Sequence, residues 1–263
     1  MKYKTVTLTT DFGYEAPWAG IMKGVMLSIN PALVVVDLTH GVLPQDIMGG
    51  ALALADSLPF FPPGTIHVAV VDPGVGSQRK AIVVKTKKCY FVGPDNGLFW
   101  PAIERLGGLE KAWRITNQEF MLQPVSATFH GRDIFAPVAA HLSRGVRPEV
   151  FGPEIDDLQK LLIARPFFEN KKLLGEIISV DAFGNLITNI TGKIIGRYDR
   201  QKLTVTINGI IVRGISLAYA EALPGKALAI VDSSDRLEIA CFKGSAALHF
   251  GAARGTPVEV NFL

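Results

Sequence analysis

The chain has 263 residues, of which 48% are hydrophobic and 19% charged, so it is suited to one large or two moderate globular domains and is not a disordered chain. The formal net charge is only +3, and the lysine pairs at 87–88 and 171–172 are isolated, so neither nucleic acid nor a membrane surface is an expected partner. The apolar runs fall far short of the roughly 18 residues of a membrane-spanning helix.

The first part of the chain alternates between strands and helices. The run at 32–39 is rich in β-branched residues, which is typical of a buried parallel strand. Asp46 stands where an N-cap is expected, and the helix that follows it ends before Pro59. In chain order we predict strands at 5–10, 32–39, 65–71, 81–86 and 90–93, the last two as an antiparallel pair, and helices at 18–29, 47–58, 97–107 and 133–145. This order predicts an α/β N-terminal domain over residues 1–150 with a mainly parallel central sheet.

Helical patterns almost vanish in the last third of the chain. The segment 151–172 has few periodic apolar positions, so we expect it to be a connector. Beyond it, short runs of Val, Ile and Thr are separated by Gly, Asn and Asp, and "TINGI" at 206–210 carries an Asn-Gly hairpin signal. This pattern predicts a smaller, all-β, barrel-like C-terminal domain over residues 173–263.

Cysteine and histidine spacing gives no sign of a disulfide framework or a metal site. Cys89 and Cys241 lie far apart and neither has a CxxC partner, so we expect buried free thiols and a reducing compartment. The N-terminus is typical of a strand and not of a signal peptide, which together with the thiols predicts a cytoplasmic protein. HExxH, HxH and Cys/His ligand sets are absent from the sequence, so no metal is expected.

The stretch "VVDPGVGSQRK" at 70–80 holds the first two glycines of a dinucleotide fingerprint, but Arg79 stands where the third belongs. A strand-like run follows it instead of a helix, so nucleotide-phosphate binding is disfavoured. One interpretation is a glycine-rich turn capped by Asp72. The alternative is that the turn brings Asp72 and Arg79 together, because a carboxylate beside an arginine stays ionised and can orient a small polar reactant.

Three other polar clusters are candidates for function. Asp11, in "TTDFG", follows the first strand, where open α/β sheets bind ligands; it is either a turn residue or an acceptor for ribose hydroxyls. His130, in "FHGRD", precedes a helix and is either an ordinary loop residue or part of a site. The stretch "DAFGNLITN" at 181–189 indicates a hairpin turn.

Taken in order, "TTDFG", "DPGVGSQR", "GPDNGLF", "TFHGRDIFAPVAAHL", "DAFGNLITNI" and "SSDRLEIA" resemble the S-adenosylmethionine (SAM) hydroxide adenosyltransferases, hydrolytic relatives of the SAM-dependent fluorinase and chlorinase. The resemblance covers nearly the whole chain. It implies cleavage of SAM to adenosine and L-methionine by attack of water or hydroxide on the ribose C5′, with SAM as substrate and no cofactor. It also implies a homotrimer that binds SAM between the N-terminal domain of one subunit and the C-terminal domain of the next.

The resemblance implies roles for particular residues. Asp72, Arg79 and His130 match the set around the nucleophilic water. In the halogenases a tyrosine replaces Asp72 and a serine follows the histidine position, where this chain has Gly131, and both differences favour water over halide. The implied substrate contacts are Asp11 for the ribose hydroxyls, Asp181 and Asn185 for the methionine amino group and the ribose or adenine side, Ser233 or Ser234 for the methionine carboxylate, Tyr219 stacked on adenine, and Phe183 in the pocket wall.

Two departures from the family pattern concern the C-terminal domain. The "DAFGN" loop is one residue shorter than in the halogenases, and "CFKG" follows "EIA" where related sequences often have asparagine. The adenine-edge contacts, expected from backbone near Lys243 to Ala246, lie in this altered stretch. Two alternative functions remain open at this point: a SAM-dependent halogenase, and a non-catalytic sensor that binds SAM or adenosine.

Overall fold

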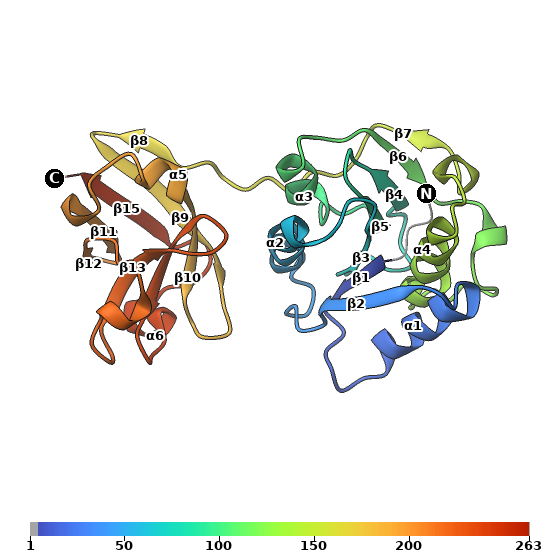
Figure 1. The fold of residues 1–263 in the computed structure, drawn as a ribbon, viewed down its shortest axis with the longest axis horizontal. Helices are drawn as coiled ribbons and strands as arrows, with labels where there is room; N and C mark the ends of the chain where they lie inside the picture. Colours follow the sequence, from blue (N-terminus) through green and yellow to red (C-terminus); the bar gives the residue numbers. More distant parts are fainter. Residues whose placement is uncertain (1–4, 263) are drawn as a thin grey trace. The chain divides into compact units, whose positions relative to one another are not determined.

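The computed structural model describes residues 5–262, which divide into an N-terminal unit ending at Leu162 and a C-terminal unit beginning at Ile163 (Figure 1). The ends of the two predicted domains, residues 1–4 and 263, lie outside the described residues. Each unit has its own hydrophobic core. We describe the units separately.

The N-terminal unit contains a seven-stranded sheet with the order β2-β1-β3-β5-β4-β6-β7. Its strands are β1 (Thr5–Thr10), β2 (Val34–Thr39), β3 (Ile66–Val70), β4 (Ala81–Lys85), β5 (Tyr90–Pro94), β6 (Lys111–Arg114) and β7 (Glu154–Ile155). The first four in sheet order are parallel, whereas β4, β6 and β7 run antiparallel to their neighbours. The sheet is therefore mixed, and the prediction of a mainly parallel sheet is confirmed only for these four strands. The predicted antiparallel pair is confirmed, because the short turn at Thr86–Cys89 permits only a hairpin between β4 and β5.

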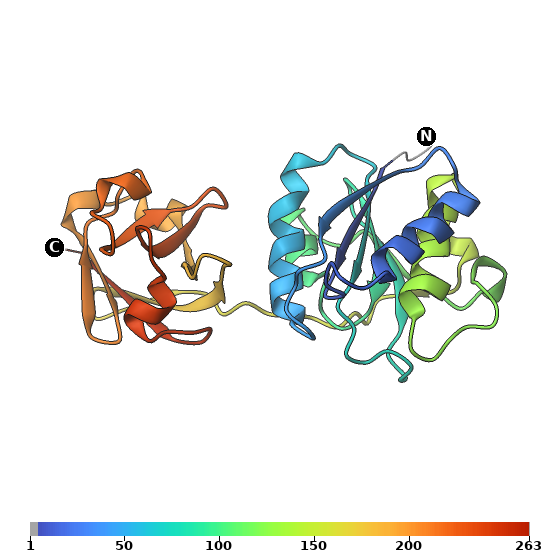
Figure 2. The same ribbon diagram turned by 90° about the horizontal axis from the view of Figure 1, so that it is seen from below.

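Helices cover both faces of this sheet (Figure 2). On one face, Met22 and Met26 of α1 and residues of α4 pack against β1 and β3; on the other, α2 and α3 pack against β5. Asp46 caps α2 as predicted, its carboxylate accepting the N–H of Gly49 at 3.0 Å. The helices are α1 (Trp18–Ile29), α2 (Ile47–Ser57), α3 (Trp100–Arg105) and α4 (Ala136–Ser143), the last preceded by a π-helical segment, Gly131–Phe135.

The strand β2 differs from its sequence-based prediction in burial. It is parallel to β1, as predicted, but lies at the edge of the sheet and is partly exposed along its length. A run of β-branched residues indicates a strand without specifying whether a neighbour covers it.

The C-terminal unit is an eight-stranded antiparallel sheet with the order β12-β11-β15-β9-β10-β14-β13, and β8 also pairs with β9. The strands are β8 (Phe167–Glu169), β9 (Lys172–Val180), β10 (Leu186–Thr191), β11 (Leu203–Ile207), β12 (Ile210–Arg213), β13 (Ala227–Val231), β14 (Arg236–Cys241) and β15 (Pro257–Phe262). The two ends approach each other where the N–H of Ser216, after β12, donates to Ala229 O of β13 at 2.8 Å. The barrel-like architecture is confirmed, and so is the Asn-Gly turn between β11 and β12, in which Asn208 and Gly209 have φ of 48° and 78°.

The C-terminal unit is not wholly β. It contains two short helices, α5 (Gly192–Ile195) and α6 (Ala246–Phe250). Helix α6 has local signals at both ends: the Ser245 hydroxyl accepts the N–H of Leu248 at 3.3 Å, and Gly251 ends the helix with φ of +56°. At five residues it is too short for an apolar period to reveal it.

Much of the expected connector, 151–172, belongs to one unit or the other. Strand β7 extends the N-terminal sheet, and the N–H of Gln159 donates to the Asp95 carboxylate at 2.9 Å. Strand β8 pairs with β9 of the C-terminal unit.

The cysteines, Cys89 and Cys241, are buried free thiols as predicted. Within residues 5–262, no helix combines the length and apolar character that crossing a membrane requires.

His67 in β3 makes the stability of the N-terminal unit depend on pH. Its imidazole is 1% exposed, between the rings of Phe61 and Phe91, with Nδ1 2.8 Å from the Thr7 hydroxyl. Burial lowers its pKa from 6.5 to about 4. On acidification, the imidazole of the unfolded chain is protonated before that of the folded chain. The stabilising contribution of the neutral, buried His67 is therefore fully present above pH 6.5 and is lost as the pH is lowered toward 4.

We predict that the unfolding free energy falls by about 2 kcal/mol between pH 7 and pH 5 through this group alone. The variant His67→Gln removes that contribution, so its stability is expected to change less over the same interval. Urea unfolding followed by tryptophan fluorescence tests this, because the three tryptophans, Trp18, Trp100 and Trp113, all lie in the N-terminal unit. An equal fall in both proteins would show that His67 does not carry the effect.

Candidate functional site

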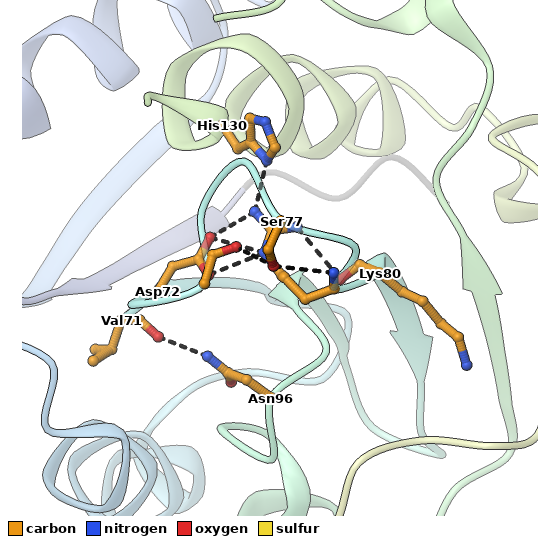
Figure 3. A network of polar contacts seen from close by, with 8 residues as sticks. Val71, Asp72, Ser77, Lys80, Asn96 and His130 are labelled. Atoms are coloured by element: carbon orange, nitrogen blue, oxygen red, sulfur yellow. Dashed lines mark hydrogen bonds and ion pairs between the residues drawn. The ribbon is translucent and has the colours of Figure 1, made fainter. Parts of the chain in front are cut away.

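The turn after β3 brings Asp72 and Arg79 together, as the second interpretation of the sequence predicted. Figure 3 shows Asp72 and His130 at this turn. Arg79 Nε donates to both carboxylate oxygens of Asp72 at 3.0 Å, and Nη2 donates to Oδ2 at 2.6 Å. Gly76 permits this turn: its φ is +77°, and a Cβ there would lie 2.4 Å from Ala127 O. The two side chains are only 5% and 10% exposed, so the ion pair is largely shielded from solvent.

His130 completes this cluster through Arg79. Nη2 of Arg79 lies 2.7 Å from His130 Nδ1. A guanidinium only donates hydrogen bonds, so Nδ1 must accept, and the imidazole is neutral with its proton on Nε2. Burial and the adjacent Arg79 charge lower the pKa of His130 from its ordinary value, in keeping with that neutral form. Arg79 also lies over the ring of Phe135, 5.2 Å from its centroid.

Asp133 holds the segment that carries His130, and sequence analysis did not identify it. The carboxylate is 1% exposed; it accepts the N–H of Ser126 at 2.8 Å and Nε of Arg132 at 2.6 Å. Gly131 allows the segment to pack closely, since a Cβ there would lie 3.1 Å from Met22 Sδ. The signal for Asp133 was an acidic residue in the first turn of a predicted helix, a pattern shared by many solvent-exposed caps.

Asp11 lies in the same cavity as Asp72 and His130. The cavity has a volume of about 240 Å³ and is lined by Asp11, Phe12, Gln45, Val70, Asp72, Pro73, Val75, Thr128, Phe129, His130 and Gly131. The N–H of Gln45 donates to one oxygen of Asp11 at 2.8 Å. The structure thus gathers Asp11, Asp72 and His130 in one cavity near the carboxyl ends of β1 and β3. Arg79 does not line this cavity but contacts both Asp72 and His130.

In the C-terminal unit, Asp181, Phe183 and Asn185 form the predicted turn between β9 and β10. One carboxylate oxygen of Asp181 accepts the N–H groups of Phe183 and Asn185 at 2.9 and 2.8 Å. The other accepts Nδ2 of Asn185 at 3.0 Å. Gly184, with φ of +81°, packs against Ser245. These contacts fix the Asp181 carboxylate, while the ring of Phe183 is left 79% exposed.

A second cavity, of about 620 Å³, opens beside this turn and is lined by Asp181, Phe183, Asn185, Tyr219, Cys241, Phe242, Lys243 and Gly244. Tyr219 begins a short 3₁₀ turn, and its hydroxyl donates to Glu238 Oε1 at 2.8 Å. Burial raises the pKa of Tyr219 to about 12, and burial also raises the pKa of Glu238, with Asp181 and Asp232 adding to both shifts. Sequence analysis missed Glu238, a single acidic residue within the apolar strand "LEIAC".

Ser233 and Ser234 lie in the turn between β13 and β14. The N–H of Ser234 donates to Asp232 Oδ1 at 2.8 Å. The lining of the second cavity includes neither serine. The structure therefore joins Asp181, Phe183, Asn185 and Tyr219 in one cavity but not these two serines.

The two cavities suit different chemistry. The first combines an ionised Asp–Arg pair with a neutral imidazole, which fits a small polar reactant such as water. The second combines three aromatic side chains with the carboxylate of Asp181, which fits a flat ring system and a cationic group. Among the described residues, no group of three His, Cys, Asp or Glu side chains is arranged to hold a metal ion.

Comparison with protein families places both units in one family. Residues 6–152 match the SAM hydroxide adenosyltransferase N-terminal domain, and residues 175–259 match the SAM hydroxide adenosyltransferase C-terminal domain.

Individual relatives agree with this result. The chain is 35% identical to the (R)-S-adenosyl-L-methionine hydrolase of Salinispora tropica, over 97% of both chains. It is 26% identical to the fluorinase of Nocardia brasiliensis, over 97% of this chain and 96% of that one. The crystal structure of an uncharacterized conserved protein from Thermotoga maritima superposes with a TM-score of 0.91 at 36% identity, over 97% of this chain and 99% of that one.

The contact between Arg79 and His130 makes a prediction about titration. In the variant Arg79→Met we expect the pKa of His130 to rise, because a neighbouring positive charge is lost and the Asp72 carboxylate is no longer neutralised. Histidine NMR titration measures this, with the signals of His40, His67, His141 and His249 as internal references. An unchanged or lowered pKa of His130 would contradict the observed geometry.

Proposed function

The chain belongs to the SAM hydroxide adenosyltransferase family, and on that premise we propose that it hydrolyses SAM to adenosine and L-methionine. The observation that carries the proposal is the cluster of Asp72, Arg79 and His130 at one cavity with Asp11. A relative of similar length, named as an (R)-SAM hydrolase and 35% identical, supports the same reaction.

The proposed reaction needs little acid catalysis. The oxygen of water forms a bond to the ribose C5′ as the C5′–S bond breaks, and the bonding electrons pass to sulfur. The sulfonium thereby becomes the neutral thioether of methionine, which leaves without taking up a proton. Catalysis must therefore act mainly on the water, which has to lose a proton and be held in line with the C5′–S bond. SAM and water together supply all the reacting groups, so we propose no further cofactor.

We assign the activation and positioning of the water to the cluster in the N-terminal unit. Asp72 orients Arg79 and accepts the proton of the attacking water, and the positive charge of Arg79 stabilises the developing hydroxide. His130 holds the water from the other side through Nε2–H, because its Nδ1 is occupied by Arg79. The partly enclosed cavity strengthens attraction between an anionic nucleophile and the cationic sulfonium.

The remaining residues are assigned to substrate binding. Asp11, with one oxygen held by Gln45, accepts the ribose hydroxyls. Asp181 and Asn185 hold the methionine amino group and the ribose or adenine side, Tyr219 stacks on adenine, and Phe183 lines the pocket. The assignment of the methionine carboxylate to Ser233 or Ser234 stays a prediction, as does that of the adenine edge to backbone near Lys243 to Ala246.

Water is favoured over halide by two residues at the site. Asp72 supplies a negative charge where a halide ion would have to bind, and it also provides a proton acceptor that a halide does not need. Gly131 offers no hydroxyl to hydrogen-bond a halide, and its packing against Met22 leaves little room for a larger side chain. The fluorinase relative is correspondingly more distant, at 26% identity, than the hydrolase relative, at 35%.

We further propose that the protein assembles as a homotrimer in which SAM contacts the N-terminal unit of one subunit and the C-terminal unit of the next. Exposed apolar side chains support an assembly, since Tyr14, Phe183 and Leu248 are 71%, 79% and 85% exposed.

The free buried thiols of Cys89 and Cys241 support a cytoplasmic location, where cysteines stay reduced.

We predict that Asp72→Asn and His130→Ala each lower kcat for adenosine formation by about a hundred-fold or more, while SAM still binds. The reason is that both side chains act on the nucleophile and not on the nucleoside. Chromatography of adenosine and isothermal titration with SAM separate the two effects.

Glu104→Gln is the control for these variants, because Glu104 is an exposed carboxylate on α3 and the substitution makes the same change from carboxylate to amide. Its kcat is expected to equal that of the wild type. Full turnover in Asp72→Asn or His130→Ala would overturn the roles assigned to them.

A further inference from the structure

The turn that carries Asp72 and Arg79 has an exposed tip. Pro73, Gly76 and Ser77 are all exposed, and the contacts of Ser77 stay within the turn, with Gly74 and Arg79. The alignment of the ion pair therefore depends on how the two ends of the turn are fixed. Those ends are Val71, directly before Asp72, and Lys80, directly after Arg79.

Asn96 fixes the first end (Figure 3). It follows β5, the parallel neighbour of β3, and its Nδ2 donates to Val71 O at 2.8 Å. Its Oδ1 accepts the N–H of Leu98 at 3.2 Å, so both ends of the amide are engaged and its orientation is set. Gly97 makes this turn possible: its φ is +93°, and a Cβ there would lie 2.9 Å from Leu161 Cβ.

The same short turn fixes the second end. The N–H of Asp95 donates to Lys80 O at 2.9 Å, and Arg79 Nη1 donates to the same oxygen at 3.4 Å. Asp95 is buried, with only 5% of its surface exposed, and it is itself held in place. Its carboxylate accepts the N–H of Gln159 at 2.9 Å. Asp95 and Asn96, in the turn that follows β5, thus hold both ends of the catalytic turn.

We propose that Asn96 is a positioning residue for the reaction, acting on Asp72 through the carbonyl of Val71. This inference rests on the proposed hydrolysis of SAM. Fixing Val71 sets the direction in which the Asp72 side chain leaves the backbone. That direction determines whether its carboxylate meets both Nε and Nη2 of Arg79, and the placement of Arg79 determines its contact with His130. An isolated asparagine in the sequence "GPDNGLF" thereby acquires a role in aligning the nucleophile.

The test is Asn96→Leu, which keeps the branched shape of the side chain and removes its amide. We expect kcat to fall on the order of ten- to a hundred-fold, as for other small misplacements of reacting groups, with KM and SAM binding nearly unchanged. The matched control is Asn117→Leu. Asn117 is also of intermediate exposure; its Nδ2 donates to Val150 O at 3.1 Å, and its Oδ1 accepts the N–H of Glu119 at 3.1 Å. Loss of the same pair of contacts there is expected to leave kcat unchanged.

A readout independent of turnover comes from the ring signals of His130 in NMR. We expect Asn96→Leu to shift these signals in the direction produced by Asp72→Asn, and Asn117→Leu to leave them in place, with thermal melting showing that each variant is folded. Unchanged His130 signals and kcat in Asn96→Leu, or an equal loss in Asn117→Leu, would overturn the inference. Absence of SAM hydrolysis by the wild type would instead refute the proposed function, and the NMR comparison would still test the positioning.

Discussion

The guanidinium of Arg79 is the group on which the rest of the candidate site depends. Withdrawing a carboxylate and an arginine from water is costly unless their geometry is good, and an unpaired partner would be left as an uncompensated charge. Here the guanidinium makes three contacts to one carboxylate and a fourth to His130, whose tautomer it sets. The glycine turn, the ring of Phe135 and the loop held by Asp133 are all features that keep this one group in place.

The fold places these residues by a simple rule. Parallel strands end at a common edge, so Asp11 after β1 and Asp72 after β3 reach one cavity although they lie far apart in the sequence. The antiparallel half of the sheet contributes differently. Because β4 returns beside β5, the turn after β5 lies against both ends of the segment 71–80. The antiparallel pairing of β4 with β5, which the sequence predicted, is what gives the catalytic turn its support.

Local patterns determined what could be predicted. The helices α1 and α2, the cap at Asp46 and the Asn-Gly turn follow from neighbouring residues, and the structure has each of them. The contact of Asp72 with Arg79 could also be predicted, because Arg79 is only seven positions after Asp72, across a glycine turn. The antiparallel strands β6 and β7, the exposed edge at β2 and the partners of Asn96 and Glu238 depend on segments distant in the chain. Neither hydrophobic periodicity nor motif spacing in the sequence specifies such long-range contacts, so these features could be identified only in the folded structure.

The central claim is that water attacks the ribose C5′ of SAM, and the position of the incoming oxygen tests it most directly. The protein is incubated with SAM in oxygen-18 water containing chloride. The products are then separated by chromatography and their masses are measured by mass spectrometry. The account predicts that adenosine carries the heavy oxygen at its 5′ position and that methionine carries none. Unlabelled adenosine, label in methionine, or a 5′-chlorinated nucleoside would contradict it.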